Sequence, residues 1–337
     1  MGKISYTLGR IKKMRFNAAF DTVKRVSLRS GKPRAFVLLD IVWCGLRYSA
    51  GYMDYDVFKM ERTNGKQRKT FITRGVNNNF VKMLNDVNYR HYFQNKDEFN
   101  TAFSDFIGRE WMLVHAEKGK EFEVWLGDKT VVIAKPRAGM CGKGIQKLYT
   151  KDFANTAELF EYILHSDCEL AEECLLQHPH LNEMYPHSIN TTRIVTVYKD
   201  GKTKVICAYL RIGNGGRHVD NFNSGGIITR VDIETGKLMF VAVDKAGITY
   251  SEHPETLTAI KGFEIPLWSS CLDLALRAAA VIPQIGLVGW DIAVTPNGPV
   301  IVEGNEFPGH DIYQMPPHTP DNYGLLPLFN EAIYGKK

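Results

Sequence analysis

Residues 288–305, reading VGWDIAVTPNGPVIVEGN, constrain the fold more than any other stretch because they predict a β-hairpin. Apolar residues alternate along both arms, as they do in strands. Between the arms, Pro296-Asn297-Gly298 is typical of a three-residue turn that ends in a left-handed glycine. Such a turn pairs Thr295 with Pro299 and thereby sets the register of the whole hairpin.

The expected register brings two acidic side chains together. Asp291 lies opposite Glu303, with β-carbons about 5 Å apart, and Asn305 is on the same face. Two facing carboxylates repel each other unless a cation or a shared proton lies between them, and the oxygens of Asp, Glu and Asn suit Mg²⁺. The hairpin therefore predicts a metal site. The alternatives are a solvated hairpin face, or an acidic pair that a nearby lysine or arginine neutralises.

Length and composition place the chain among ordinary soluble globular proteins. It has 337 residues, 44% of them hydrophobic and 23% charged, which is ample for a core. The net charge of +5 suits anionic ligands such as nucleotides and does not demand nucleic acid. The six cysteines show no zinc spacing and indicate reduced thiols in a cytoplasmic protein. No signal peptide is visible, and the most apolar run, residues 35–46, contains Asp40 and is too short to span a bilayer.

The N-terminal segment, residues 1–34, is strongly basic, with ten Lys or Arg residues against one acid, Asp21. Its apolar residues recur at helical spacing and include Ile4, Leu8, Ile11, Ala18, Thr22 and Val26. A basic amphipathic helix could lie on an anionic membrane surface. We favour the other interpretation, a helix that packs on the domain and leaves its basic face in solvent.

A glycine-rich loop follows a short apolar strand at residues 131–134. The loop reads KPRAGMCGKGI and begins with Lys135. Glycines let backbone N–H groups approach phosphate oxygens closely, and a lysine at the end of the strand can reach the same phosphates. The spacing is not that of a Walker A loop. By itself such a loop could equally be a flexible connection.

Three other basic residues stand where a ligand contact is plausible. Lys96 opens a predicted helix, where the helix dipole favours anions, so its role lies outside the helix unless it is a plain surface lysine. Arg193 and Arg211 lie within strand patterns at residues 188–197 and 205–212. Buried arginines need partners, which are either acids at the edge of the core or a phosphate or carboxylate substrate. A polar loop at residues 220–226 could line a substrate pocket or serve as a connection.

Four features in this order resemble the ATP-grasp superfamily: Asn95-Lys96, the strand with Lys135-Pro136 and the glycine loop, the Glu172-Glu173 hinge, and Asp291 followed by Glu303-x-Asn305. The resemblance covers about residues 90 to 310. Within the superfamily, the chain resembles the sugar-transfer-associated ATP-grasp group. The segments that carry this narrower resemblance are AKPRAGMCGKGI, EECLLQHP, SINTTRIVTV, GGIITRVDIETGKL and GWDIAVTPNGPVIVEGN.

The resemblance implies an α+β protein with the ATP-grasp fold, in which two α+β subdomains sandwich ATP after a mostly helical N-terminal region. The expected parts are a basic segment (1–34), a helical or mixed region (35–110), a lid subdomain with the glycine loop (111–172) and a C-terminal subdomain with the metal site (173–337). The implied ATP-binding residues are Lys96, Lys135, Gly139, Gly142, Lys143, Gly144, Glu172, Glu173, Cys174 and Leu175. Asp291, Glu303 and Asn305 would hold the metal, and Arg193 and Arg211 would be catalytic.

The implied activity is that of an ATP-dependent carboxylate–amine ligase that acts through an acylphosphate. The product would be an amide on a sugar acid or amino acid in cell-surface polysaccharide biosynthesis. Two alternatives stay open: a phosphotransferase that acts on a sugar hydroxyl, and a non-catalytic nucleotide-binding protein that docks on a membrane. The expected cofactors are ATP and Mg²⁺, with Mn²⁺ as a substitute. The expected partners are a small-molecule or glycan-linked carboxylate and an amine, not nucleic acid. The expected location is cytoplasmic, with residues 1–34 offering peripheral contact at the inner face of the membrane.

Overall fold

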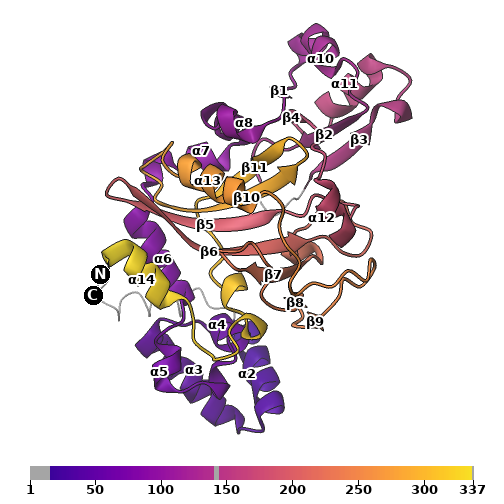
Figure 1. Ribbon diagram of the computed structural model, residues 1–337. Helices are drawn as coiled ribbons and strands as arrows, with labels where there is room; N and C mark the ends of the chain where they lie inside the picture. Colours follow the sequence, from indigo (N-terminus) through magenta and orange to yellow (C-terminus); the bar gives the residue numbers. More distant parts are fainter. Residues whose placement is uncertain (1–15, 140–143, 336–337) are drawn as a thin grey trace. The chain divides into compact units, whose positions relative to one another are not determined.

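The computed structural model describes residues 16–139 and 144–335, which form two compact units (Figure 1). One unit comprises residues 1–84 together with 309–337, and the other comprises residues 85–308. In the described part of the chain, no helix combines the length and the apolar character needed to cross a membrane.

A seven-stranded antiparallel sheet forms the centre of the unit 85–308. Its strand order is β11-β10-β5-β6-β7-β8-β9. The strands are β5 (Thr192–Lys199), β6 (Lys202–Ile212), β7 (Ile227–Val231), β8 (Ala242–Val243), β9 (Thr249–Tyr250), β10 (Leu287–Thr295) and β11 (Gly298–Asn305). Every residue of β10 is buried, because neighbouring strands pair with both of its edges and other elements cover its faces. The acidic residue of this strand therefore lies in the interior of the unit.

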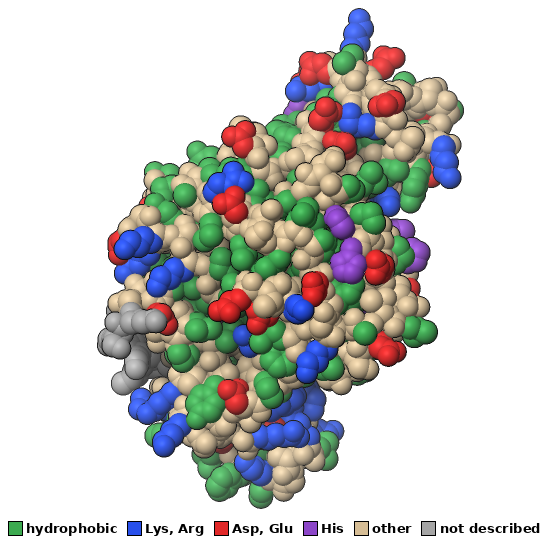
Figure 2. All heavy atoms as spheres, in the orientation of Figure 1, with side chains coloured by type: hydrophobic (Ala, Val, Ile, Leu, Met, Phe, Trp, Pro, Cys, Tyr) green, Lys and Arg blue, Asp and Glu red, His purple; other side chains and the backbone are tan. Residues whose placement is uncertain are grey.

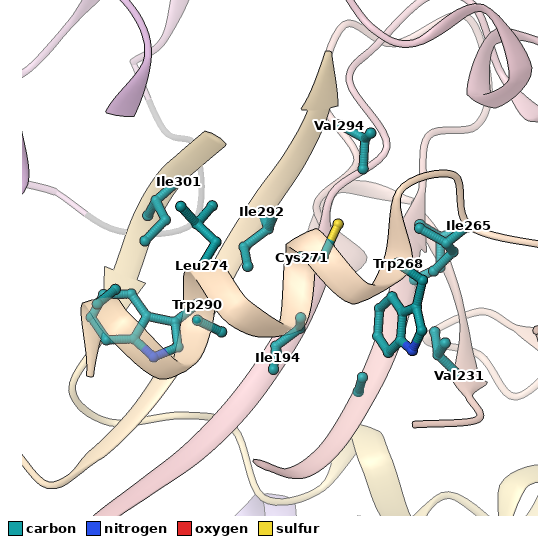
Figure 3. Close-up of a cluster of buried hydrophobic side chains, with 14 of the residues drawn as sticks. Ile194, Val231, Ile265, Trp268, Cys271, Leu274, Trp290, Ile292, Val294 and Ile301 are labelled. Carbon is teal, nitrogen blue, oxygen red and sulfur yellow. The ribbon is translucent and has the colours of Figure 1, made fainter. Parts of the chain in front are cut away.

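Helix α13 (Trp268–Ala278) covers one face of this sheet. Its Cys271 and Leu274 point toward Trp290 and Ile292 of β10 and Ile194 of β5 (Figure 3). Full burial of one such aliphatic side chain contributes about 1.5–3 kcal/mol. The indole N–H of Trp290 donates a hydrogen bond of 2.9 Å to Thr196 Oγ1, so the buried ring keeps no unmet polar group. This packing holds β10 and β5 rigidly in register.

The same unit contains a smaller four-stranded antiparallel sheet with the order β1-β4-β2-β3. Its strands are β1 (Trp111–Leu113), β2 (Val131–Lys135), β3 (Gln146–Tyr149) and β4 (Leu170–Glu173). Helices α10 (Gly119–Leu126) and α11 (Thr156–Leu164) pack on it through Phe122, Phe160 and Ile163. The short helices of the unit are α7 (His91–Gln94), α8 (Lys96–Ala102), α9 (Ser104–Ile107) and α12 (Pro179–Met184). We call this smaller sheet with α10 and α11 the lid.

The other unit is helical. Its helices are α2 (Phe16–Ser30), α3 (Arg34–Tyr48), α4 (Tyr52–Val57), α5 (Gly65–Arg68), α6 (Arg74–Leu84) and α14 (Leu326–Tyr334). Helix α2 buries Thr22 and Val26, and its Arg29 Nε lies 2.8 Å from Glu61 Oε1. The described part of the basic segment is thus a packed helix, the interpretation favoured above, whereas Ile4, Leu8 and Ile11 lie outside the described residues.

The C-terminal tail belongs to this helical unit and not to the unit 85–308, whereas the predicted C-terminal subdomain ran from 173 to 337. Gln314 explains the grouping, because its side-chain oxygen accepts a 2.9 Å hydrogen bond from the backbone N–H of Ile72 and its amide donates to the Ile72 carbonyl. His310 pairs with Asp54 at 2.8 Å in the same unit. The predicted boundary at 34 likewise falls inside one compact unit, which continues to residue 84.

Candidate nucleotide and metal site

Strands β10 and β11 pair as a hairpin in which Asp291 lies opposite Glu303, as predicted. The predicted turn was wrong, because Thr295 pairs with Gly298 and not with Pro299. Gly298, at a φ of +126°, is already the first residue of β11, so the loop is one residue shorter than expected. A β-bulge next to Asp291 absorbs one extra residue of β11 and restores the expected acidic pair.

Asp291 is 1% exposed and is held by two arginines. Arg193, its partner across the strands β10 and β5, donates to both carboxylate oxygens, and its Nη2 lies 2.7 Å from Oδ2. Arg211 of β6 donates to Oδ2 as well. Burial by itself raises the pKa of a carboxyl, but the two arginines outweigh it and hold the pKa of Asp291 well below its usual range. Asp291 is therefore an ionised, fully paired carboxylate.

Glu303 is in a different state, with a side chain that is 46% exposed. Desolvation by the surrounding protein and the negative charge of Asp291 raise the pKa of Glu303. Asn305 Nδ2 lies 3.3 Å from Glu303 Oε1, and Arg193 Nη2 lies 3.9 Å from the same oxygen. The two carboxylates that the sequence predicted to face each other therefore do repel. The arginines offset this repulsion much more at Asp291 than at Glu303.

The donor set of Asp291, Glu303 and Asn305 fits Mg²⁺, because all three supply hard oxygen ligands. Glu303 and Asn305 are the accessible members, whereas Asp291 would have to share its oxygens with Arg193 and Arg211. No group of three or more His, Cys, Asp or Glu side chains that could hold a metal occurs in residues 16–139 and 144–335. A metal here would therefore depend on the Asn305 amide and on ligands from a substrate phosphate, as is usual for Mg²⁺.

Lys96 begins helix α8 and is held by the start of the glycine loop. Its Nζ donates to the carbonyl of Pro136 at 2.9 Å and to that of Gly139 at 3.4 Å. The backbone makes the same connection, since Lys96 N–H donates to the Arg137 carbonyl at 3.0 Å. Lys96 therefore contacts the loop that follows β2 directly, through both its side chain and its backbone.

Lys135 lies at the end of β2 and is 8% exposed. Its ammonium group belongs to a buried ionic network around Glu172 of β4. Lys135 Nζ lies 2.5 Å from Glu172 Oε2, and Arg109 Nε lies 2.8 Å from the same oxygen. Asn100 donates to the other oxygen at 3.0 Å. Burial alone would raise the pKa of Glu172, but Arg109 and Lys135 hold it far below its usual range. These contacts indicate that Glu172 positions Lys135.

Arg109 was missed in the sequence. Besides Glu172, it donates to the carbonyls of Ile301 at 2.8 Å and Val302 at 3.1 Å, and so ties lid strand β4 to strand β11. The available signal was a lone cation between apolar segments in the stretch FIGREWML. Asp220, at the start of the polar loop 220–226, was also missed as a partner, and it lies 2.9 Å from Arg211.

The remaining predicted nucleotide contacts lie on the glycine loop and at and after the end of β4. Gly139 and Gly144 flank the undescribed part of the loop, so Gly142 and Lys143 lie outside the described residues. Gly144 has a φ of +76°, and an added Cβ would lie 2.8 Å from the Pro136 ring, so the position requires glycine. Residues 174–178, which include Cys174 and Leu175, form an irregular connection from β4 to α12. Glu173 is half-buried and accepts a 3.2 Å hydrogen bond from the N–H of Glu110.

Charged residues on other elements act on Lys96. Burial and the positive charge of Lys135 lower the pKa of Lys96, while Glu303 and Glu172 act in the opposite direction. Lys135 of β2 and Glu303 of β11 thus both act electrostatically on Lys96. Lys96 is half-buried and Lys135 is buried, and two such ammonium groups suit a strongly anionic ligand.

The family model described as sugar-transfer-associated ATP-grasp matches residues 76–327. A search of curated proteins finds no match. Among solved structures, the ATP-grasp ligase PsnB with minimal precursor, Mg and ADP is 15% identical at a TM-score of 0.40, over 72% of this chain and 61% of its own. D-alanyl-alanine synthetase A from Vibrio cholerae is 14% identical at a TM-score of 0.44, over 72% of this chain and 63% of its own.

A third structure, D-alanine–D-alanine ligase from Helicobacter pylori, is 12% identical at a TM-score of 0.46, over 77% of this chain and 70% of its own. The chain spans less than two thirds of the length of PsnB and of the Vibrio cholerae enzyme. The family model covers both sheets, the candidate lysines and the acidic hairpin, and it confirms the predicted ATP-grasp fold. The chain belongs to the sugar-transfer-associated ATP-grasp family.

Proposed function

We propose that this protein is an ATP-dependent carboxylate–amine ligase that acts through an acylphosphate. The observation that carries the proposal is a series of contacts within one unit. Lys96 contacts the loop after β2, Lys135 contacts Glu172, and Arg109 joins Glu172 to strand β11, which bears Glu303. In the proposed complex, ATP lies between the lid and the seven-stranded sheet. Residues 174–178, which connect β4 to α12, hold the adenine through their backbone, and the glycine loop covers the phosphates.

The lysines supply the positive charge for the phosphates. The pKa of Lys96 is lowered by burial and by Lys135, so the apo site contains cation repulsion that an oxyanion would relieve. Lys135 is pre-positioned by Glu172, which reduces the conformational entropy that it loses on binding. This arrangement favours a polyphosphate over a singly charged ligand.

Asp291, Glu303 and Asn305 would hold Mg²⁺, which when bound offsets the charge of the transferring phosphoryl group. Arg211 is shared by Asp220 and Asp291, so we assign it a positioning role. Arg193 also reaches toward Glu303, at 3.9 Å, and is the better candidate to stabilise charge during phosphoryl transfer.

The chemistry requires no nucleophilic side chain. A substrate carboxylate oxygen attacks the γ-phosphorus and ADP leaves, and an amine nitrogen then attacks the acyl carbon, so that phosphate leaves and the amine loses a proton. A closed lid protects the acylphosphate from water. Burial raises the pKa of the Cys207 and Cys271 thiols to about 12, so neither is a thiolate nucleophile near neutral pH.

The substrate proposal follows the family description, which associates this ATP-grasp group with sugar transfer. We propose that the carboxylate is a sugar acid or amino acid, free or glycan-linked, that the amide enters a cell-surface polysaccharide, and that the reaction takes place in the cytoplasm. Mn²⁺ is expected to replace Mg²⁺, because the same oxygen donors suit both metals.

We expect a panel of uronates and amino acids, incubated with Mg-ATP and hydroxylamine, to yield ADP and an acyl hydroxamate in equal amounts for the true carboxylate. Hydroxylamine traps the acylphosphate, so this product distinguishes a ligase from a kinase. ADP formed with a phosphate ester and without hydroxamate would contradict the proposal and favour phosphotransfer to a hydroxyl. A Lys135→Met variant is the control and should lose both products together.

Replacing Glu303 by glutamine is expected to separate stability from activity. The variant removes the repulsion by Asp291, so the free energy of unfolding should stay constant or rise by up to about 1 kcal/mol. Because the pKa of Glu303 is raised in the folded state, the gain should appear as the pH increases above about 4, where the carboxyl of the unfolded wild type ionises before that of the folded protein.

In the same Glu303→Gln variant, Mg-dependent ATP turnover should fall by about 100-fold or more, because a charged metal ligand is lost. Denaturant titrations over pH and ADP release measure the two effects. Glu264→Gln is the matched control, since the Glu264 side chain is 60% exposed and lies in another part of the sheet unit. A large loss of stability in Glu303→Gln, or undiminished turnover, would refute the assignment.

A further inference from the structure

Helix α3 (Arg34–Tyr48) is apolar on the side that faces solvent. Only Val37 and Cys44 of this helix are buried. Leu39 is 68% exposed and Trp43 is 56% exposed. The other exposed large apolar residues of the helix are Phe36, Leu38, Val42 and Leu46.

These six exposed residues form one continuous face. At 3.6 residues per turn they fall within an arc of about 160°, with Arg34 at one border and Arg47 at the other. Both arginines are exposed, and neither forms an ion pair with an acid among the residues that the structure describes. We call residues 34–47 on this side the α3 face. A contiguous exposed apolar face of this kind marks an interaction surface.

The positive charge of the helical unit indicates what kind of partner the α3 face binds. Residues 1–84 contain 18 Lys or Arg and 5 acidic residues, a net charge of +13, whereas the whole chain carries +5. Figure 2 shows Lys and Arg side chains beside hydrophobic ones over the helices at the bottom of the view, where Figure 1 labels α2, α3 and α5. A second copy would bring two strongly positive regions together. Residues 1–15 contain five Lys or Arg and no acid, so they too would repel the arginines at the border.

We propose that the α3 face docks the protein on an anionic lipid surface. Its apolar residues enter the boundary between headgroups and acyl chains, Trp43 lies at that boundary, and Arg34 and Arg47 meet lipid phosphates. The mode is peripheral, because α3 has 15 residues and about 20 are needed to span a bilayer. The docking element is thus the helix after the basic segment 1–34, whose described helix α2 directs Thr22 and Val26 into the core.

This surface is independent of the proposed ligase chemistry. Helix α3 lies outside residues 76–327 matched by the family model, and it belongs to the helical unit and not to the unit with the candidate site. A failure of membrane binding would leave the ligase proposal intact, and the reverse also holds.

The test is co-sedimentation of the full chain with vesicles of phosphatidylglycerol mixed with phosphatidylcholine, and with vesicles of phosphatidylcholine alone. We expect binding to the anionic vesicles that weakens with salt, and at least about tenfold weaker binding to the neutral ones. Leu39→Glu with Trp43→Glu should weaken binding by about 100-fold or more, because two apolar side chains no longer enter the membrane. Arg34→Glu with Arg47→Glu should weaken it by about 25-fold or more, since each charge contributes about fivefold.

Val124→Glu is the matched control, because Val124 is 83% exposed on helix α10 and the variant adds the same negative charge in the other unit. It should bind vesicles like the wild type. Equal thermal unfolding of all variants establishes that they are folded, and the exposed arginine pair tests the proposal even if the apolar pair misfolds. The proposal is overturned if the wild type does not bind anionic vesicles, or if both double variants bind them as well as Val124→Glu does. It is also overturned if light scattering shows a wild-type dimer that Leu39→Glu/Trp43→Glu abolishes.

Discussion

Replacing Asp291 by asparagine is expected to lower the free energy of unfolding by about 3–5 kcal/mol and to reduce ATP turnover below detection. The substitution preserves the shape of the side chain but removes the only full negative charge that Arg193 contacts at hydrogen-bond distance within residues 16–139 and 144–335. Arg193 is 8% exposed and would be left as a buried, poorly compensated cation. Arg211 would retain Asp220 at 2.9 Å. Urea titration and ADP release measure the two losses.

Asp200→Asn is the matched control for this change. The Asp200 side chain is 86% exposed in a tight turn at a φ of +49°, a conformation that asparagine adopts readily. The control should change stability by less than about 0.5 kcal/mol. An Asp291→Asn variant that is stable yet inactive would assign Asp291 to the metal alone, whereas an active one would contradict the site itself.

Replacing Glu172 by glutamine is also expected to lower the free energy of unfolding by about 3–5 kcal/mol. The reason is again the loss of a buried negative charge, here in the network of Arg109 and Lys135. Glu172 is 2% exposed and neutralises both Arg109 and Lys135. Without its charge, the two cations repel each other in a buried setting, and Lys135 loses the partner that orients it. The KM for ATP should therefore rise together with the loss of stability. Removal of the second charge in Glu172→Gln/Lys135→Met should recover part of the stability but no activity.

The pH dependence of unfolding tests the same network. The folded-state pKa of Glu172 lies far below its unfolded value, so its contribution to stability is complete above the unfolded pKa of about 4.3 and is lost as the pH falls below it. Stability of the wild type should therefore decline below about pH 4, and Glu172→Gln should show a shallower decline. The control is Glu173→Gln, because Glu173 is half-buried and contacts the Glu110 backbone. Identical acid slopes in wild type and Glu172→Gln would remove Glu172 from the network.

The facing pair Asp291 and Glu303 could be predicted because alternation and a short turn are local properties of the chain. The prediction was right although its turn was one residue too long, since a bulge compensated for the error. Lys96 and the loop after Lys135 could likewise be selected from local signals, a cation at a helix start and a glycine-rich segment after a strand. Their assignment as one nucleotide site came from the order of these features along the chain.

The partners of these residues could not be read from the sequence. Arg109 and Glu172 are separated by 63 positions, and Arg193 and Asp291 by 98. Many acids are available to a buried arginine at such separations, and only the pairing of β5 with β10 and of β1 with β4 selects one of them. The grouping of residues 309–337 with residues 1–84 was missed for the same reason, since it depends on hydrogen bonds such as that between Gln314 and Ile72.

The sequence by itself thus determined the acidic hairpin and the candidate phosphate ligands, because each follows from residue types a few positions apart. It indicated the family through the order of these features along the chain. Only the tertiary structure decided that arginines compensate the charge of Asp291 much more closely than that of Glu303, and that Glu172 holds Lys135. It also decided that α3 presents an apolar face to solvent, since the same run of apolar residues is equally compatible with a buried helix. Burial and charge pairing are properties of the neighbours that folding brings together, and those neighbours are distant in the chain.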